Sequence, residues 1–291
     1  MAKNSSSGKP LAGRVALVAG ATRGAGRGIA RALAEAGATV YCTGRSVTGK
    51  PSPYRRPETI NETATLIKAA GGAAIAVRVD HTSEREVTAL FRRILRAHRR
   101  LDVVVDSVAG EDPVLKPHGF LWQADLRNAD AMFRQGLTSR IITAKHAALA
   151  MMPAKRGLIV EVTENDIIGG GANPIAHAVK TAQKLLPLAW ATELAAHGIS
   201  VLAITPGFLR SESMLQHRFR AEEAGRDGED RDAMGRELGG PLEREQLLRR
   251  LDGMRDRVCA AADDVVFRDF DDEAAPGGHH RARGMLRRDD A

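Results

Sequence analysis

The chain contains few cysteine and aromatic residues, and this excludes several classes of protein. Its two cysteines, Cys42 and Cys259, are too few for a disulfide framework, and their spacing matches no zinc motif, so we expect no metal site. Aromatic residues make up 4% of the chain and no nucleic-acid-binding motif is present. We therefore expect no nucleic-acid partner, although the formal net charge is +7.

Long apolar runs are also absent. No run approaches the ~20 residues that a helix needs to span a bilayer, and the N-terminal residues lack the apolar region of a signal peptide. We therefore expect a cytoplasmic protein without a membrane partner.

Charge is distributed unevenly along the chain. Residues 221–291 contain 13 Arg, no Lys and 19 acidic residues, a net charge of −6, whereas the first 220 residues carry a net charge of +13. Such positive charge is compatible with nucleic acid, but a basic surface around a site for a polyanionic cofactor explains it equally well, and the lack of a nucleic-acid motif favours the cofactor.

Strand-like and helical patterns alternate over most of the chain. Apolar runs predict strands over residues 15–19, 39–42, 73–79, 101–105, 158–162 and 199–204. Amphipathic stretches predict helices over residues 24–36, 58–70, 83–98, 129–152 and 175–197, with Ser83 as the N-cap of the third. This order predicts an α/β fold of the doubly wound Rossmann type, with a parallel sheet between two helical layers in a single domain.

A glycine-rich turn joins the first predicted strand to the first predicted helix. Gly20, Gly24 and Gly26 stand in a G-x-x-x-G-x-G pattern that also includes Thr22. Without side chains the backbone can turn sharply and approach a pyrophosphate, which the helix N-terminus attracts. Glycine turns also serve packing alone, but a position between a strand and a helix favours a dinucleotide-binding turn.

Two arginines indicate which dinucleotide is bound. Arg45 follows the second predicted strand, where an acidic residue would hold the ribose 2′-hydroxyl of NAD. Its planar, charged guanidinium favours a 2′-phosphate instead, and Arg23 in the glycine turn adds a second positive group. Both could be solvated surface residues, but their two positions together predict NADP (NADPH) as the cofactor, with NAD less favoured.

In these motifs the chain resembles the short-chain dehydrogenase/reductase (SDR) family, whose turn reads T-G-x-x-x-G-x-G and differs here only at Ala19. The resemblance covers roughly residues 14–215. It implies that Asp80, after the third predicted strand, meets the adenine ring, and that Pro206 and Gly207 hold the nicotinamide carboxamide, with Ser211 completing that motif.

One departure from the family pattern follows the fourth predicted strand. The segment Asp106-Ser107-Val108-Ala109-Gly110 stands where the family usually has N-N-A-G, so Ala109 and Gly110 fall at its cofactor-binding end. This change, with the Pro- and Gly-rich loop over residues 45–57, resembles a subgroup with altered motifs and an extended loop after the second strand.

The resemblance implies an oxidoreductase acting on a small carbonyl or alcohol substrate. The family moves a proton through a tyrosine whose pKa is lowered by a lysine four residues later, assisted by a serine and an asparagine. Lys180 stands at the lysine position and would also bind the nicotinamide ribose. The tyrosine position holds Ala176, the serine position falls at Thr163 or Glu164, and the asparagine position falls near Leu137.

His177 is a candidate replacement for the missing proton donor. It precedes Lys180 by three residues, a spacing at which helical neighbours share a face, and its ordinary pKa suits acid–base chemistry. It also points about 100° away from Ala176, and a lone histidine is more often a surface or packing residue. Glu164 and Asp166 are alternative acids that could equally be solvated loop carboxylates.

Two functions therefore stay open: an oxidoreductase with an atypical or impaired catalytic set, and a non-catalytic NADP-binding sensor or partner protein. A decayed gene product is a third possibility. In the family the helix carrying Lys180 commonly forms a subunit interface, so we expect a homo-oligomer, although Pro187 within this helix counts against that interface. We expect residues 1–13 to be a flexible tail, residues 14–220 the NADP-binding domain, and residues 221–291 a divergent, charged and partly disordered segment.

Overall fold

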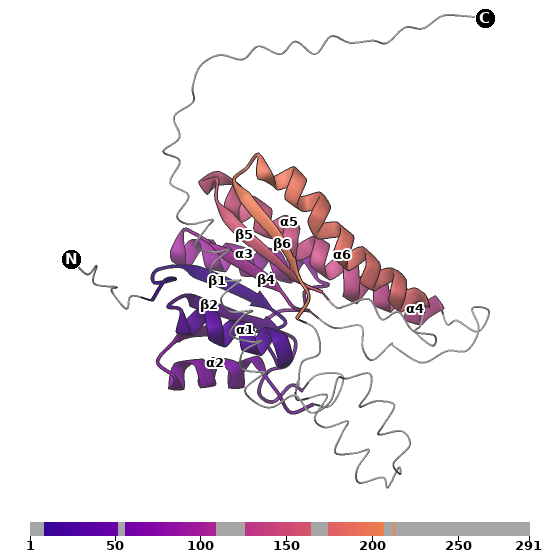
Figure 1. Ribbon diagram of the computed structural model, residues 1–291. Helices are drawn as coiled ribbons and strands as arrows, with labels where there is room; N and C mark the ends of the chain where they lie inside the picture. Colours follow the sequence, from indigo (N-terminus) through magenta and orange to yellow (C-terminus); the bar gives the residue numbers. More distant parts are fainter. Residues whose placement is uncertain (1–8, 52–55, 109–125, 164–173, 207–211, 213–291) are drawn as a thin grey trace, which may run out of the picture.

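A parallel sheet forms the centre of the molecule (Figure 1). The computed structural model describes residues 9–51, 56–108, 126–163, 174–206 and 212, and the structural statements below concern these residues. Six strands pair in the order β3-β2-β1-β4-β5-β6. They are β1 (Val15–Ala19), β2 (Thr39–Gly44), β3 (Ala73–Arg78), β4 (Val103–Asp106), β5 (Gly157–Val162) and β6 (Ile199–Ile204). This order confirms the doubly wound fold.

Helices cover both faces of the sheet, because each crossover between parallel strands carries one. The helices are α1 (Gly24–Glu35), α2 (Ile60–Ala69), α3 (Glu84–His98), α4 (Leu126–Phe133), α5 (Ser139–Met151) and α6 (Pro174–Ala195). Helices α1 and α2 pack on one face, and α3, α5 and α6 pack on the other. Strands β1, β4 and β5 are buried along their whole length, which explains why they appear in the sequence as continuous apolar runs, whereas the edge strands β3 and β6 are partly exposed.

The alternation of side chains along each strand divides the core into two apolar clusters. Val18 and Val40 contribute to the cluster beneath α1 and α2. Leu17 and Val104 contribute to the cluster beneath α3, α5 and α6.

The N-termini of the first three helices differ in how they are capped. Thr59 accepts a hydrogen bond from the N–H of Glu62 at the start of α2, and Ser83 accepts one from Glu86 at the start of α3, as predicted for Ser83. The N-cap of α1 is Arg23, whose side chain makes no capping hydrogen bond, and the first turn of α1 contains no acidic residue. Helix α1 therefore begins without a local cap.

The helix predicted around residues 129–152 is present, but it is not a regular α-helix. A π-helical turn, η3 (Arg134–Thr138), separates α4 from α5, and the 3-10 turn η4 (Met152–Ala154) follows. Within η3 the carbonyl oxygen of Gly136 accepts a hydrogen bond from Nε2 of Gln183 on α6, 2.9 Å away. Such π-turns interrupt helices mainly at functional sites, and periodicity in the sequence does not reveal them.

The prediction of a flexible tail over residues 1–13 is wrong for residues 9–13. Leu11 is fully buried in the cluster beneath α1 and α2, and its N–H donates to the carbonyl oxygen of Ala36, 2.8 Å away. Residues 9–13 are therefore part of the packed fold rather than of a flexible tail. The predictions for residues 1–8 and for residues 221–291 lie outside the described residues.

Pro187 lies inside α6 without ending it. The helix extends from Pro174 to Ala195, and Trp190 and Leu194 beyond the proline pack against the sheet. Proline lacks an N–H, so one backbone hydrogen bond of the helix is missing at this position. The contacts with the core keep the helix intact despite this loss.

Candidate functional site

A pocket opens at the carboxyl edge of the sheet, where the strand order reverses between β1 and β4. In open parallel sheets this switch point is where ligands bind, because the loops that follow the two neighbouring strands diverge there. The pocket is lined by Gly20, Thr22, Arg23, Gly44, Arg45, Ser46, Val79, Asp80, His81, Thr82, Ser107, Val108 and Gln135. Five predicted cofactor-binding residues therefore lie together: Gly20, Thr22, Arg23, Arg45 and Asp80.

The turn between β1 and α1 requires glycine at two positions. Gly20 has a φ of +79°, and a Cβ there would lie 2.9 Å from the nitrogen of Val108 and overlap the carbonyl group of Ser107. A Cβ on Gly26 would overlap the carbonyl oxygen of Gly20. The turn is thus packed directly against the chain that follows β4, and its backbone is exposed to any ligand in the pocket.

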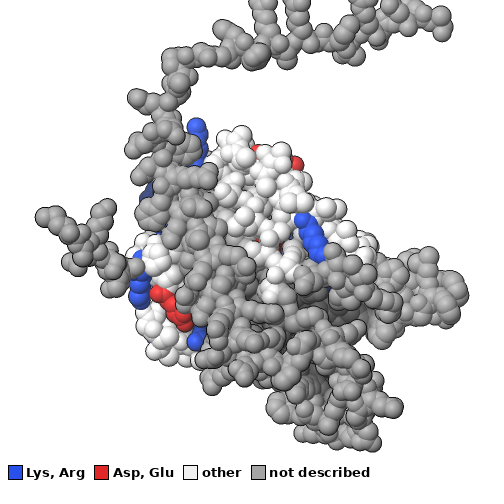
Figure 2. Space-filling model, viewed as in Figure 1, with Lys and Arg blue, Asp and Glu red and all other residues white. Residues whose placement is uncertain are grey.

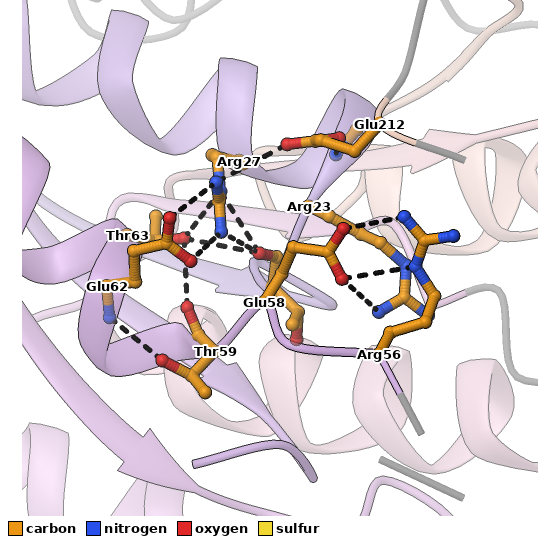
Figure 3. A network of polar contacts seen from close by, with 10 residues as sticks. Arg23, Arg27, Arg56, Glu58, Thr59, Glu62, Thr63 and Glu212 are labelled. Atoms are coloured by element: carbon orange, nitrogen blue, oxygen red, sulfur yellow. Dashed lines mark hydrogen bonds and ion pairs between the residues drawn. The ribbon is translucent and has the colours of Figure 1, made fainter. Parts of the chain in front are cut away.

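Arg23 belongs to an ionic network around Glu58 (Figure 3). Its Nη1 lies 3.8 Å from Oε2 of Glu58, and Arg56 donates to the two oxygens of that carboxylate over 2.6 and 3.1 Å. Burial raises the pKa of Glu58, but the hydrogen bonds and charge of Arg56, with the charge of Arg23, outweigh it and hold the pKa below its usual range. Glu58 therefore stays ionised and offsets part of the positive charge at Arg23.

Arg45 is placed differently from Arg23. It follows the last residue of β2, and its Nη2 donates to Oε1 of Gln135 over 3.4 Å. Asp80 lies in the same pocket, where its Oδ1 accepts hydrogen bonds from the N–H and the hydroxyl of Thr82. Burial raises the pKa of Asp80, but these bonds and the nearby charge of Arg45 lower it overall. An ionised carboxylate therefore accompanies the arginine in the pocket.

Gln135 and His81 line the pocket but were not predicted from the sequence. Gln135 comes from the π-turn η3, which no motif announces. His81 is buried, with its Nε2 2.9 Å from the hydroxyl of Thr43 and its Nδ1 2.9 Å from the hydroxyl of Thr143. Burial lowers the pKa of His81, so the neutral ring ties β2 and the end of β3 to α5.

The predicted catalytic residues lie on α6 and at the end of β5. Ala176 is buried in a small apolar cluster with Met132 and Val179, whereas the adjacent His177 is exposed. Lys180 is partly exposed and lies one turn after Ala176, on the same face of α6. The residue four positions before the lysine is therefore an alanine that packs against apolar side chains and has no group that can transfer a proton.

Thr163 is buried just beyond β5. Its hydroxyl donates to the carbonyl oxygen of Ile204 over 3.3 Å and lies 2.9 Å from the hydroxyl of Thr205. These contacts attach Thr163 to the end of β6. The adjacent candidate Glu164 falls outside the described residues.

The remaining predicted site residues lie partly within and partly outside the described residues. Gly24 is the first residue of α1, and Pro206 follows β6 at the carboxyl edge. Outside the described residues lie Ala109, Gly110, Asp166, Gly207, Ser211 and Tyr54. The sequence has one other tyrosine, Tyr41, which is buried in β2 with its hydroxyl 2.9 Å from His98 Nε2. His98 ends α3, whose first residue lies near the pocket, so Tyr41 is directed away from it.

A buried ionic cluster connects β4 and β5 beneath the site. Nη1 of Arg140, on α5, lies 2.6 Å from Glu161 Oε2 and 4.0 Å from Asp106 Oδ1. Nη2 of the same arginine donates to the carbonyl oxygens of Val108 and Val162, each over 3.1 Å. Burial, with the charge of Asp106, raises the pKa of Glu161 to about 8. The arginine thus holds the ends of two strands together where they enter the site.

The described part of the chain has no metal cluster and no membrane-spanning helix. No group of His, Cys, Asp and Glu there could hold a metal ion, and no described helix is long and apolar enough to cross a membrane. On the face shown in Figure 2, the visible Lys and Arg side chains are scattered rather than gathered into one patch. The positive charge of the first 220 residues is therefore not concentrated on that visible surface.

Comparison with known proteins identifies the family. The family described as short chain dehydrogenase matches residues 14–223. Human dehydrogenase/reductase SDR family member 1 is 32% identical over 216 residues, which cover 73% of this chain and 66% of the human protein. The chain thus spans slightly less than two thirds of the length of this curated relative. It belongs to the short-chain dehydrogenase family of oxidoreductases.

Solved structures agree with this assignment. A metagenomic short-chain oxidoreductase in complex with NADP is 31% identical, with a TM-score of 0.59 over 68% of this chain and 84% of that chain. A short-chain type dehydrogenase/reductase from Mycobacterium marinum is 27% identical, with a TM-score of 0.61 over 70% of this chain and 78% of that chain. Members of the family use NAD or NADP, which agrees with a pocket at the switch point.

Proposed function

We propose that this chain binds NADP(H) in the pocket at the β1–β4 switch point and reduces or oxidises a small carbonyl or alcohol substrate with an altered proton-donating group. The observation that carries the proposal is the meeting of the glycine turn, Arg45 and Asp80 in one pocket. The relative with bound NADP supports the choice of cofactor. The nicotinamide, when bound, supplies or accepts the hydride.

The residues of the pocket fit such a cofactor. The turn from Gly20 to Gly26 needs glycine for its close backbone packing and leads into the N-terminus of α1, whose own first turn supplies no cap, so it would hold the phosphates. Arg45 would meet a 2′-phosphate with its planar guanidinium. Asp80 would lie at the adenine ring and Lys180 at the nicotinamide ribose, by the family resemblance.

Titration calorimetry with NADPH and NADH tests the cofactor proposal. We expect NADPH to bind at least about tenfold more tightly than NADH, because a 2′-phosphate gains a charge-assisted contact worth more than a neutral hydrogen bond. Equal affinity would contradict NADP selectivity. Binding of neither dinucleotide would contradict the proposed site itself.

A non-catalytic NADP-binding sensor or partner protein is the second candidate function. Ala176 is buried among apolar side chains, and the hydroxyl of Thr163 is engaged by the end of β6. Oxidation of NADPH by the full chain in the presence of a panel of small aldehydes and ketones separates the two functions. We expect turnover that Lys180→Ala abolishes, and binding of NADPH without turnover of any carbonyl would favour the sensor.

We also propose that the chain forms a homo-oligomer through α6. Leu185 and Leu188, on either side of Pro187, are 59% and 63% exposed, which is unusual for large apolar side chains in a helix. In the family this helix commonly contacts a second copy. Light scattering at several protein concentrations measures the mass, and a monomer throughout would overturn this part of the proposal.

A further inference from the structure

Helix α1 receives its N-terminal cap from a residue far away in the sequence. The N–H of Gly24, the first residue of α1, donates to Oε2 of Glu212 over 2.8 Å across 188 positions of sequence. Oε1 of the same carboxylate lies 3.4 Å from Nη1 of Arg27. Figure 3 shows Glu212 reaching over Arg27 on α1. The first turn of α1 contains no capping side chain, so the Glu212 carboxylate supplies the acceptor for the N–H of Gly24.

Arg27 is held in place to receive this anion. Its Nε and Nη2 both donate to the carbonyl oxygen of Thr22, over 3.1 and 2.7 Å. On its other side, Glu62 lies 2.8 Å from Nη2. The arginine side chain is only 12% exposed, so its orientation is fixed by these contacts. A helix N-terminus and an ordered guanidinium therefore converge on one negatively charged group.

The Glu212 carboxylate thus occupies the terminus at which the proposed function places the cofactor phosphates. The N–H of Gly24 belongs to the same glycine turn as the pocket residue Gly20, and a dinucleotide presents its pyrophosphate to the start of this helix. A carboxylate and a phosphate cannot both accept from one N–H, and their like charges repel at this separation.

We infer that Glu212 is an internal competitor of the cofactor, a carboxylate that stands in for a phosphate at the N-terminus of α1 and leaves it when a dinucleotide binds. The inference rests on the proposed dinucleotide site. The contact stabilises the unliganded protein. Because the contact must break when the cofactor binds, its free energy reduces the net free energy of cofactor binding. Removing the carboxylate therefore strengthens cofactor binding while it weakens the unliganded fold.

The test compares Glu212→Ala with a matched control, Glu62→Ala. Both carboxylates pair with Arg27, but only Glu212 accepts from the N–H of Gly24. Calorimetry with NADPH measures the affinity of the full chain. We expect Glu212→Ala to bind about three- to thirtyfold more tightly than the wild type, and Glu62→Ala to stay within about twofold of it. Equal gains in the two variants would overturn the inference, since general charge removal would then explain both.

A second probe isolates the helix N-terminus from the rest of the pocket. Inorganic pyrophosphate lacks both nucleosides, so its stabilising effect on the melting temperature reports the phosphate position alone. Without ligand we expect Glu212→Ala to melt about 2–4 °C below the wild type, and saturating pyrophosphate to remove most of that difference. Weaker binding of pyrophosphate by Glu212→Ala would also overturn the inference.

The two proposals fail in different ways. Failure of the wild type and Glu212→Ala alike to bind NADPH and NADH would refute the dinucleotide site, and the competition with it. Binding by the wild type with unchanged or weaker binding by Glu212→Ala would refute only the competition. Glu212→Gln keeps an oxygen that can accept from Gly24 but loses the charge, so we expect its affinity to lie between those of the wild type and Glu212→Ala.

Discussion

The proposed cofactor half of the site and its proposed catalytic half are built from different kinds of feature. Around β1, β2 and α1 the important features belong to the backbone: a positive φ at Gly20, a close approach at Gly26 and a helix N-terminus that its own first turn leaves uncapped. Around β5, β6 and α6 they belong to single side chains, and there Ala176 is part of an apolar cluster. Backbone geometry depends on the whole fold and tolerates little change, whereas a catalytic side chain can be replaced without loss of the fold.

Arg140 connects the two halves. Its guanidinium contacts the chain after β4, which borders the pocket, and the end of β5, which leads to Thr163. The geometry of the catalytic half is thus maintained by buried charge. Changes to single residues can show whether the proposed catalytic half is intact apart from the alanine at position 176.

Restoring a tyrosine should give the largest effect. If the rest of the catalytic half is assembled, Ala176→Tyr places a phenol one turn before Lys180 and should raise carbonyl reduction by about 10²–10⁴-fold. The rate of NADPH oxidation measures it. Ala178→Tyr, which puts the same side chain at an exposed position of α6, is the control and should leave the rate unchanged. A folded Ala176→Tyr protein without any gain would show that more than the tyrosine is missing.

Breaking the buried cluster should destabilise the protein strongly. Arg140→Met leaves the buried Asp106 without its cation and the buried Glu161 without its hydrogen-bond partner, and we expect a loss of about 3–5 kcal/mol in the free energy of unfolding. Urea denaturation measures this loss. Lys145→Ala, on the same helix, removes an exposed ion pair with Glu84 that solvent screens, and should change the free energy of unfolding far less. Similar losses in the two variants would refute the structural role of Arg140.

The same cluster should make stability depend on pH. The pKa of Glu161 is about 8 in the folded protein and lies near 4.5 in the unfolded chain, so the folded state retains a proton that the unfolded state releases. Its stabilising contribution is complete below pH 4.5 and is lost as the pH rises towards 8, by at most about 1.4 kcal/mol per pH unit. Urea denaturation at pH 5, 6.5 and 8 should show this slope for the wild type.

Two variants identify the source of that slope. Glu161→Gln should reduce it, because the amide does not titrate. Glu35→Gln, at an exposed position of α1, should keep the slope of the wild type. A slope that survives in Glu161→Gln would place the titrating group elsewhere.

Removing Arg45 should give the smallest effect and should act on the cofactor half alone. Arg45→Ala should weaken NADPH binding by about tenfold, equivalent to about 1.4 kcal/mol, and leave NADH binding within about twofold. Calorimetry with both dinucleotides measures the difference. Arg78→Ala removes an exposed arginine at the end of β3, the strand beside β2, and should change neither affinity. An equal loss for both dinucleotides would argue against a 2′-phosphate contact at Arg45.

Much of this architecture could be predicted from the sequence. The alternation of apolar runs and amphipathic stretches located all six described strands, and Ser83 was correctly identified as an N-cap. The π-turn over Arg134–Thr138 and the burial of Leu11 could not be predicted. Both depend on partners distant in the sequence: Gln183 bonds to the first, and Ala36 to the second.

The parallel sheet, the glycine turn and the absence of a tyrosine before Lys180 can all be read from the sequence, because they follow from local composition and spacing. Which groups meet depends on the folded chain. It placed Gln135 beside Arg45, buried Asp106 and Glu161 around one guanidinium, and brought Glu212 to the start of α1. Contacts across 188 positions leave no periodic trace in a sequence, since they depend on the folded path of the chain rather than on neighbouring residues.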